Sequence, residues 1–301
     1  MRWKYLLLIP LIALVGILFA AEFLAWRMII IPERKYQDEE ALSYTRDHLV
    51  EQMVISSDGL QISSLVCYPN LSDSLEGRGS IVLLHGIGSS RGALGPQADY
   101  LMDLGYKVII PDQRAHGSSD GEYCSFGYHE RNDVSRILDA LIEQGDQGPF
   151  GVYGISMGGS VAAMSLASEE RLSFGIIQST FADLGQIVKD YQRNMFGLSL
   201  PLLSNRALNR AGKRADFDPD VVSPLAVATE FDVPVFISHG TADEDISSNY
   251  SWDIYNAVQV DEKVFFPIET ADHLNWWDVG GQEYKDALKG FLYYIVPMAD
   301  S

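Results

Sequence analysis

The sequence contains only two cysteines in 301 residues, Cys67 and Cys124. Two cysteines cannot build a disulfide framework, and these two have no spacing typical of a metal or redox site, although the sequence leaves open whether they pair. No glycine-rich phosphate loop and no metal-ligand spacing occurs elsewhere. We therefore expect no cofactor and no bound metal. Internal repeats and low-complexity segments are absent too, which argues against a solenoid or a disordered chain.

Basic residues are scarce. Lysine and arginine total 22 against 41 aspartates and glutamates, and the formal net charge is -19. Such a chain repels polyanions, so we expect no nucleic-acid partner. The same charge argues mildly against anionic lipids as ligands. With 47% hydrophobic and 21% charged residues, the composition is that of an ordinary globular protein. The length fits one large α/β domain better than two small ones.

Charged residues are missing altogether from Tyr5 to Ala21. As a helix, this run reaches roughly 26 Å, slightly less than the hydrocarbon core of a bilayer. Trp3 and Trp26 flank it, as interfacial aromatics do. We predict an N-terminal transmembrane helix that anchors the protein within residues 1–32. A signal peptide is the alternative, but the small residues needed three positions before a cleavage site are replaced by bulky ones.

The basic residues around this run give only weak information on orientation. Arg2 and Lys4 precede it, while Arg27, Arg34 and Lys35 follow it. The short basic start favours a cytoplasmic N-terminus and an extracytoplasmic main domain, and a secreted protein is the alternative. Residues 33–47 are polar and predict a connector. The main domain then covers residues 48–301.

Strands and helices alternate along most of this domain. A hairpin is predicted at Glu51–Tyr68 around Ser57-Asp58-Gly59. Hydrophobic periodicity then predicts strands at 80–84, 107–110, 150–155, 174–178, 235–238 and 264–266, and helices at 96–104, 128–144, 157–168 and 284–296. This order predicts an α/β fold, a mostly parallel central sheet with helices on both faces. Residues 181–231 lack a clear strand and predict a short cap insertion.

One serine lies where a predicted strand becomes a helix, in Gly154-Ile155-Ser156-Met157-Gly158. Side chains at the two glycine positions would clash in the sharp turn that such a junction requires. The turn holds the hydroxyl out, and the helix N-terminus below it offers free N–H groups for an oxyanion. We therefore predict that Ser156 is a catalytic nucleophile.

A serine nucleophile needs a base and an acid that orients the base. His273 is the best base among six histidines because it lies in a loop after the last predicted strand. Asp243 follows the preceding strand, and Glu244 and Asp245 are near enough to be alternatives. The catalytic prediction is therefore Ser156, Asp243 and His273, in the chain order of the α/β-hydrolases.

Several segments together resemble the α/β-hydrolase superfamily. They are LLHGIGSS, PDQRAHGSSDG, FGYHERNDV, GISMGGSVAA, HGTADEDI and ADHLNWW, and the resemblance covers residues 80–295. Within the superfamily, the serine hydrolases of the BEM46/ABHD group, which are similar to serine aminopeptidases and lysophospholipases, are the most alike. The resemblance implies that the backbone amides of Ile87 and Met157 form the oxyanion hole. Two positions depart from the family pattern, because Ala115 and Asp272 stand where glycine is usual.

The sequence thus predicts a cofactor-free serine hydrolase that acts through an acyl-enzyme. We expect a carboxylic ester as substrate, either a small-molecule acyl ester or a lipid-like ester or thioester. A serine peptidase of the aminopeptidase type is the first alternative, and it requires an acidic pocket, for which the cap offers Asp216, Asp218 and Asp220. The second alternative is a membrane-tethered, non-catalytic binding protein. The oligomeric state is left open.

Overall fold

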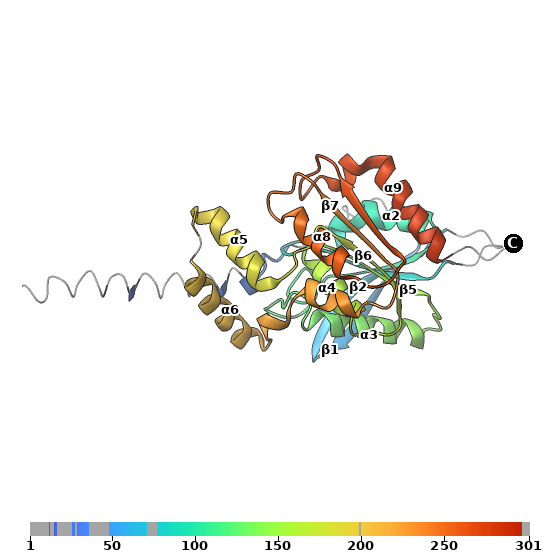
Figure 1. Cartoon of the computed structure of the whole chain (residues 1–301). Coiled ribbons are helices and arrows are strands. Elements are labelled where there is room, and N and C mark those ends of the chain that lie inside the picture. The colour runs from blue at the N-terminus through green and yellow to red at the C-terminus, as the bar shows by residue number, and fades with distance from the viewer. Residues whose placement is uncertain are drawn as a thin grey trace, which may run out of the picture.

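Eight strands form a single mixed sheet in the computed structural model (Figure 1). The strand order is β1-β2-β4-β3-β5-β6-β7-β8, with β3 to β8 all parallel. The structure describes residues 12, 15–16, 26–27, 29–35, 48–70, 77–198 and 200–296.

The first two strands, β1 (Val50–Ser57) and β2 (Leu60–Cys67), form the predicted antiparallel hairpin. Asp58 and Gly59 make its two-residue turn, both with positive φ, which is the conformation that an Asp-Gly hairpin favours. β2 also pairs antiparallel with β4 (Lys107–Pro111). The hairpin thereby becomes the antiparallel edge of an otherwise parallel sheet.

The parallel strands are short, and all of them except the edge strand β8 are almost entirely buried. They are β3 (Ser80–Leu84), β5 (Phe150–Ile155), β6 (Leu172–Gln178), β7 (Val235–Gly240) and β8 (Lys263–Ile268), together with β4. Because parallel strands end at the same edge, the polar residues that follow them gather along one rim of the sheet.

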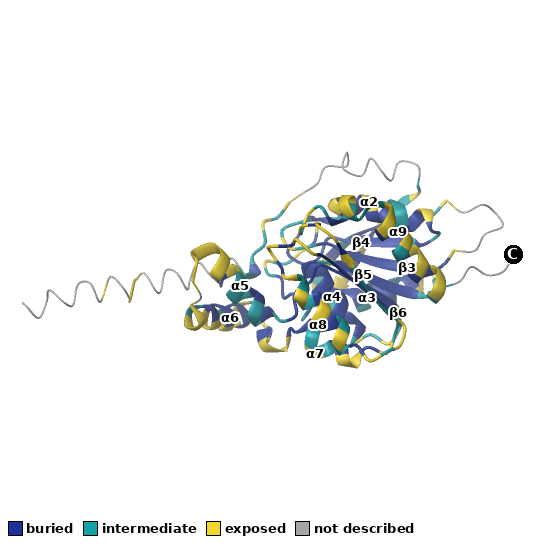
Figure 2. Ribbon diagram, turned by 45° about the horizontal axis from the view of Figure 1, so that its top comes forward, coloured by how far each residue is buried: buried dark blue, intermediate teal, exposed yellow. Residues whose placement is uncertain are grey.

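Helices cover both faces of the sheet, as predicted. On one face, α3 (Glu130–Glu143), α4 (Met157–Leu166) and α8 (Ser248–Ala257) pack apolar side chains onto the strands. On the other face, α2 (Gly95–Asp103) and α9 (Trp276–Ile295) do the same. Each face therefore has its own apolar layer, and Figure 2 shows the strands buried between them.

The chain between β6 and β7 has no strand among its described residues. It forms α5 (Leu184–Phe196), α6 (Pro201–Ala215), the 3-10 turn η3 (Pro219–Val221), the short α7 (Pro224–Val227) and η4 (Ala228–Glu230). In Figure 1, α5 and α6 lie side by side and project away from the sheet. Their inner sides contribute to a third apolar cluster, separate from the two beside the sheet.

Two sequence-based predictions differ from the structure. The last helix begins at Trp276 and not at Tyr284, and it is broken at Gly281, where φ is 49°. This glycine interrupts the periodicity on which the prediction relied. Helix α8 was not predicted at all, because its polar residues and short length give a weak pattern.

The predicted anchor over residues 5–21 lies outside the described residues, apart from Ile12, Val15 and Gly16. None of the helices in the described part of the chain is long and apolar enough to cross a membrane.

Candidate active site

Ser156 occupies a strained turn between β5 and α4. Its φ is 58° and its ψ is -118°, a conformation that side chains rarely adopt and that is tolerated where the surroundings enforce it. A Cβ atom at Gly154 would lie 1.9 Å from the Gly158 carbonyl oxygen, and one at Gly158 would lie 2.3 Å from the Leu84 carbonyl oxygen. The predicted steric need for both glycines is therefore confirmed.

The structure brings Ser156, His273 and Asp243 into one hydrogen-bonded chain. The Ser156 hydroxyl lies 3.0 Å from Nε2 of His273, and Nδ1 of His273 lies 2.7 Å from Oδ2 of Asp243. Since Nδ1 faces a carboxylate, it carries the proton, and Nε2 is left to accept one from the serine. The side chain of Asp243 is fully buried, and that of His273 is 14% exposed.

Asp243, and not its neighbour Glu244 or Asp245, is the carboxylate that orients His273. One of its oxygens accepts hydrogen bonds from the backbone amides of Asp245 and Ile246, and the other accepts from His273 and His239. Burial alone would raise the pKa of Asp243, but these hydrogen bonds outweigh it and hold the pKa well below its usual value. The carboxyl group therefore stays ionised beside the imidazole.

His239 is a site residue that the sequence analysis did not identify. Its Nε2 lies 3.1 Å from Oδ2 of Asp243 and 2.9 Å from the Ile246 carbonyl oxygen, both of them acceptors. Nε2 therefore carries the proton, and Nδ1 accepts a hydrogen bond from the Ser251 hydroxyl at 2.7 Å. The four-residue spacing of His239 and Asp243 was visible in the sequence, but their contact depends on the turn between them.

Asp272 does not compete with Asp243 for the histidine. Its carboxylate accepts hydrogen bonds from the backbone amides of Leu274 and Asn275 and from the Asn275 side chain. This arrangement holds the turn that presents His273.

Ile87 and Met157, the residues that the resemblance assigns to the oxyanion hole, line the same cavity as Ser156. Gly86 brings the Ile87 loop against the serine, because a Cβ atom there would lie 3.3 Å from Cβ of Ser156. Met157 is the first residue of α4, where amides lack an intrahelical partner. Within the described chain, neither amide makes a hydrogen bond, so both are available to an incoming oxygen.

Two buried histidines brace this loop. His116 donates from Nδ1 to the Arg114 carbonyl oxygen, and its Nε2 accepts from the amide of Gly88. His85 donates from Nδ1 to the Gly86 carbonyl oxygen and accepts from the amide of Gln113. Burial lowers the pKa of His116 and lowers that of His85 to about 4. Both are neutral near pH 7 and serve as supports of the loop.

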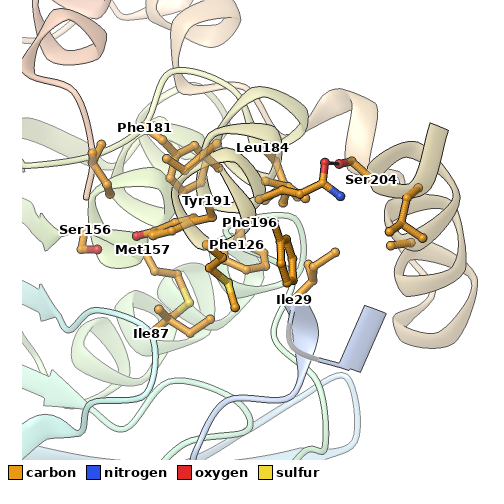
Figure 3. A pocket seen from close by; sticks show the side chains of 17 residues that line it. Ile29, Ile87, Phe126, Ser156, Met157, Phe181, Leu184, Tyr191, Phe196 and Ser204 are labelled. Carbon is orange, nitrogen blue, oxygen red and sulfur yellow. Dashed lines mark hydrogen bonds between the residues drawn. The ribbon is translucent and has the colours of Figure 1, made fainter. Parts of the chain in front are cut away.

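A cavity of about 610 Å³ opens at Ser156 and runs beneath the cap (Figure 3). It is lined by Ile29, Ile87, Phe126, Ser156, Met157, Phe181, Leu184, Ile187, Val188, Tyr191, Gln192, Met195, Phe196, Leu203, Ser204, Ala207 and Ile246. The lining is apolar except for a few groups, and among these the Ser204 hydroxyl donates to the side-chain oxygen Oε1 of Gln192 at 2.8 Å. No lining residue carries a carboxylate.

The N-terminal segment contributes to this site, which the sequence analysis did not predict. Trp26 and Ile30 are buried in the cluster that also holds the inner side of α6, and Ile29 lines the cavity. The guanidinium of Arg34 donates to the carbonyl oxygens of Gly117, Ser119 and Gly121. We call residues 26–35 the strap, because its described residues join the cap to the loop after β4.

This chain is similar to known proteins in sequence and in fold. Residues 76–223 match the family model described as serine aminopeptidase, S33. The uncharacterized protein YqkD of Bacillus subtilis is 26% identical over 220 residues, 71% of this chain and 70% of that protein.

Two solved structures have the same fold. The Pyrococcus furiosus esterase Pf2001 has a TM-score of 0.70 and 22% identity and covers 89% of this chain and 98% of its own. Est1E from Butyrivibrio proteoclasticus, solved with ferulic acid bound, has a TM-score of 0.65 and 16% identity and covers 81% and 99%. These similarities do not show membership of the BEM46/ABHD subfamily, and that membership stays a prediction.

Proposed function

We propose that this chain, which has the fold of known esterases, is an α/β-hydrolase and acts as a cofactor-free serine hydrolase of carboxylic esters with apolar acyl groups. One observation carries this proposal: a serine hydroxyl, bonded to an oriented histidine, faces an apolar cavity of about 610 Å³. The cavity is of a size that accommodates a small-molecule ligand.

The chemistry follows from the hydrogen bonds already described. The oxygen of Ser156 attacks the ester carbonyl carbon while Nε2 of His273 takes its proton. The amides of Ile87 and Met157 donate to the oxyanion, and Asp243 stabilises the imidazolium that forms. His273 then protonates the leaving alcohol as the carbon–oxygen bond breaks. Water attacks the acyl-enzyme with the same histidine as base, and the carboxylic acid leaves.

An ester substrate is favoured over a peptide by the charge of the cavity. An aminopeptidase needs a carboxylate for the substrate's ammonium group, and the cavity lining has none. Asp216, Asp218 and Asp220 are exposed and do not line it. The family model carries the name of a peptidase, and for this reason the peptidase alternative belongs in the same experiment.

Labelling with a fluorophosphonate probe is the direct test of the nucleophile. Wild-type protein should be labelled covalently and Ser156→Ala should not. A series of acyl nitrophenyl esters and amino-acid anilides then separates the two reactions, with the esters turned over at higher kcat/KM. Absence of labelling in folded wild-type protein would favour the non-catalytic binding protein, and preferential cleavage of anilides would favour the peptidase.

We also propose that residues 5–21 anchor the protein in a membrane, with the hydrolase domain on the extracytoplasmic side. The support is the uncharged run in the sequence and its short basic start. Protease accessibility of the domain in spheroplasts or sealed vesicles tests the orientation, and extraction at alkaline pH tests the anchoring.

A further inference from the structure

The tip of the cap exposes a dense group of large apolar side chains. Five large apolar side chains are exposed within eight residues around the turn from α5 to α6: Met195, Phe196, Leu198, Leu200 and Leu202. Leu202 is 83% exposed and Phe196 61%. Exposed apolar groups of this density on a soluble protein mark an interaction site. We call these five residues the cap tip.

The charge of the two cap helices is opposite to that of the whole protein. α5 and α6 contain six basic residues, Lys189, Arg193, Arg206, Arg210, Lys213 and Arg214, and one acidic residue, Asp190. Asp190 already accepts hydrogen bonds from Gln186, Arg193 and Tyr250. The chain as a whole has a net charge of -19. Asp183, Asp216, Asp218 and Asp220 lie in the segments that flank these helices, so the excess of basic residues is confined to the two helices themselves, where it favours an anionic partner.

The spacing of these charges from the apolar side chains matches a bilayer surface. Arg193 lies three residues before Phe196, and Arg206 lies four residues after Leu202, so both are about 5 Å along their helix axes from the tip. An apolar group that enters the boundary between headgroups and acyl chains reaches about 5–10 Å deep. Guanidinium groups would then lie at the level of the lipid phosphates.

The position of the strap also supports a membrane on the cap side of the protein. Trp26 and Ile30 belong to the same buried apolar cluster as Ala207, Leu208 and Ala211 of α6, so the strap enters the domain beside the cap. The guanidinium of Arg214 lies 5.5 Å from the centroid of the Trp26 ring. Only four residues separate Trp26 from the end of the uncharged run, a chain length of at most about 18 Å. An anchor in that run would hold the cap side against the membrane.

From these observations we propose that the cap tip docks into the surface of a bilayer that contains anionic lipids. The cavity lies directly behind it, since Met195 and Phe196 both line the cavity and are exposed. A lipid-like ester can therefore pass its acyl chain from the leaflet to Ser156 without crossing water. This route rests on the proposed ester hydrolysis, whereas the docking does not.

Site-directed fluorescence on the full chain tests the docking. Cys67 and Cys124 are free and buried, so Leu202→Cys offers one exposed thiol for an environment-sensitive fluorophore. Tyr294→Cys is the matched control, because Tyr294 is 71% exposed on α9 near the C-terminal end, opposite the cap (Figure 1). The wild-type protein, treated with the same fluorophore, should remain unlabelled, which would show that its two native thiols do not react.

The labelled proteins are placed in nanodiscs of phosphatidylcholine with and without phosphatidylglycerol. We expect the probe at position 202 to shift to shorter wavelength, to be protected from aqueous iodide and to be quenched by spin-labelled lipid, most strongly with phosphatidylglycerol. The probe at position 294 should stay accessible to iodide. Equal accessibility of the two positions would overturn the proposal. Protection at position 202 without lipid, dependent on protein concentration, would overturn it in favour of a second copy of the chain.

A kinetic test separates docking from catalysis. Leu202→Asp removes a leucine from the leaflet, and burial of one leucine corresponds to about tenfold or more in partitioning. We expect kcat/KM for a monoacylglycerol in phosphatidylglycerol vesicles to fall by about that factor, with hydrolysis of a soluble short ester unchanged. An equal loss on both substrates would contradict the docking role. If the wild type hydrolysed none of the esters, the proposed function would be refuted, but the fluorescence result would still decide whether the cap tip docks.

Discussion

The rim of the sheet and the cap surround the same serine with very different side chains. At the rim, His85, His116 and His239 are fully buried, and their ring nitrogens are engaged in hydrogen bonds. In the cap, apolar side chains line a cavity and continue to an exposed tip. A saturated polar network holds atoms in fixed positions, whereas an apolar wall accepts many chain shapes. The comparison assigns the chemistry to the rim and the choice of acyl group to the cap.

The largest effect should follow from changing the acid at the rim. In Asp243→Asn, the carbonyl oxygen would accept from the amides of Asp245 and Ile246, so the NH₂ group would face Nδ1 of His273. The imidazole would then adopt the tautomer that cannot take the serine's proton, and kcat should fall by about 10⁴-fold. Steady-state kinetics on a nitrophenyl ester measure this, with circular dichroism as the control for folding. A loss of less than tenfold would mean that Asp243 does not orient the base.

The buried histidines of the rim predict how stability depends on pH. The pKa of His85 falls from 6.5 to about 4 on folding, so the unfolded chain binds the proton first as pH decreases. His85 has no effect on stability above pH 6.5 and should remove about 3 kcal/mol of the unfolding free energy by pH 4.

Urea unfolding followed by tryptophan fluorescence at several pH values measures this slope. His85→Gln should flatten the curve between pH 6.5 and 4, because glutamine does not titrate there. Identical slopes in the wild type and the variant would show that this histidine is not held neutral by burial.

His239 tests whether the rim is one connected network. His239→Leu removes the second side-chain donor to Asp243, and loss of a hydrogen bond to a charged group should lower kcat/KM by about 10–100-fold. It should also raise the pKa of the Asp243 carboxyl, because the carboxylate loses a donor that lowers this pKa, so activity on the acidic side should be lost at a higher pH than in the wild type. His239→Gln keeps a donor and should recover part of the activity. Equal losses with leucine and glutamine would mean that only packing matters.

A change in the cap should alter substrate choice and leave the chemistry at Ser156 intact. Ala207 is fully buried and lines the cavity from α6. Ala207→Phe fills part of the cavity, and we expect the ratio of kcat/KM for dodecanoyl to butyryl esters to fall by about tenfold, the equivalent of roughly two methylene groups. Fluorophosphonate labelling at a rate similar to that of the wild type would show that the nucleophile is intact. An unchanged ratio would show that the cavity does not select the acyl group.

The smallest effect is expected at Ala115. This residue is buried with a φ of 67°, a left-handed conformation that costs a non-glycine residue about 1–2 kcal/mol. Ala115→Gly relieves the strain but loses a buried methyl group worth about 0.8 kcal/mol and gains chain entropy when unfolded. The net change in unfolding free energy should stay within about 1 kcal/mol, as measured by urea denaturation. A loss well beyond this would show that the methyl group is required in the rim.

Much of the fold could be predicted because alternating apolar segments and glycine turns act locally. The hairpin at Asp58-Gly59, the buried parallel strands and the covering helices all follow from patterns within a few residues. The start of α9 and the whole of α8 could not be predicted in the same way. A glycine break at Gly281 and a polar, ten-residue segment leave too little periodicity for such an inference.

The sequence by itself determined the order of the strands and helices, the turn at Ser156 and the residue types at the ends of the strands, because these depend on neighbours in the chain. Only the tertiary structure decided which groups meet. It put His239 on the same carboxylate as His273, seated the strap against α6 and assembled the apolar cavity from segments between Ile29 and Ile246. The physical reason is that hydrogen bonds and cavities form between surfaces that folding brings together, and no local pattern encodes those distances.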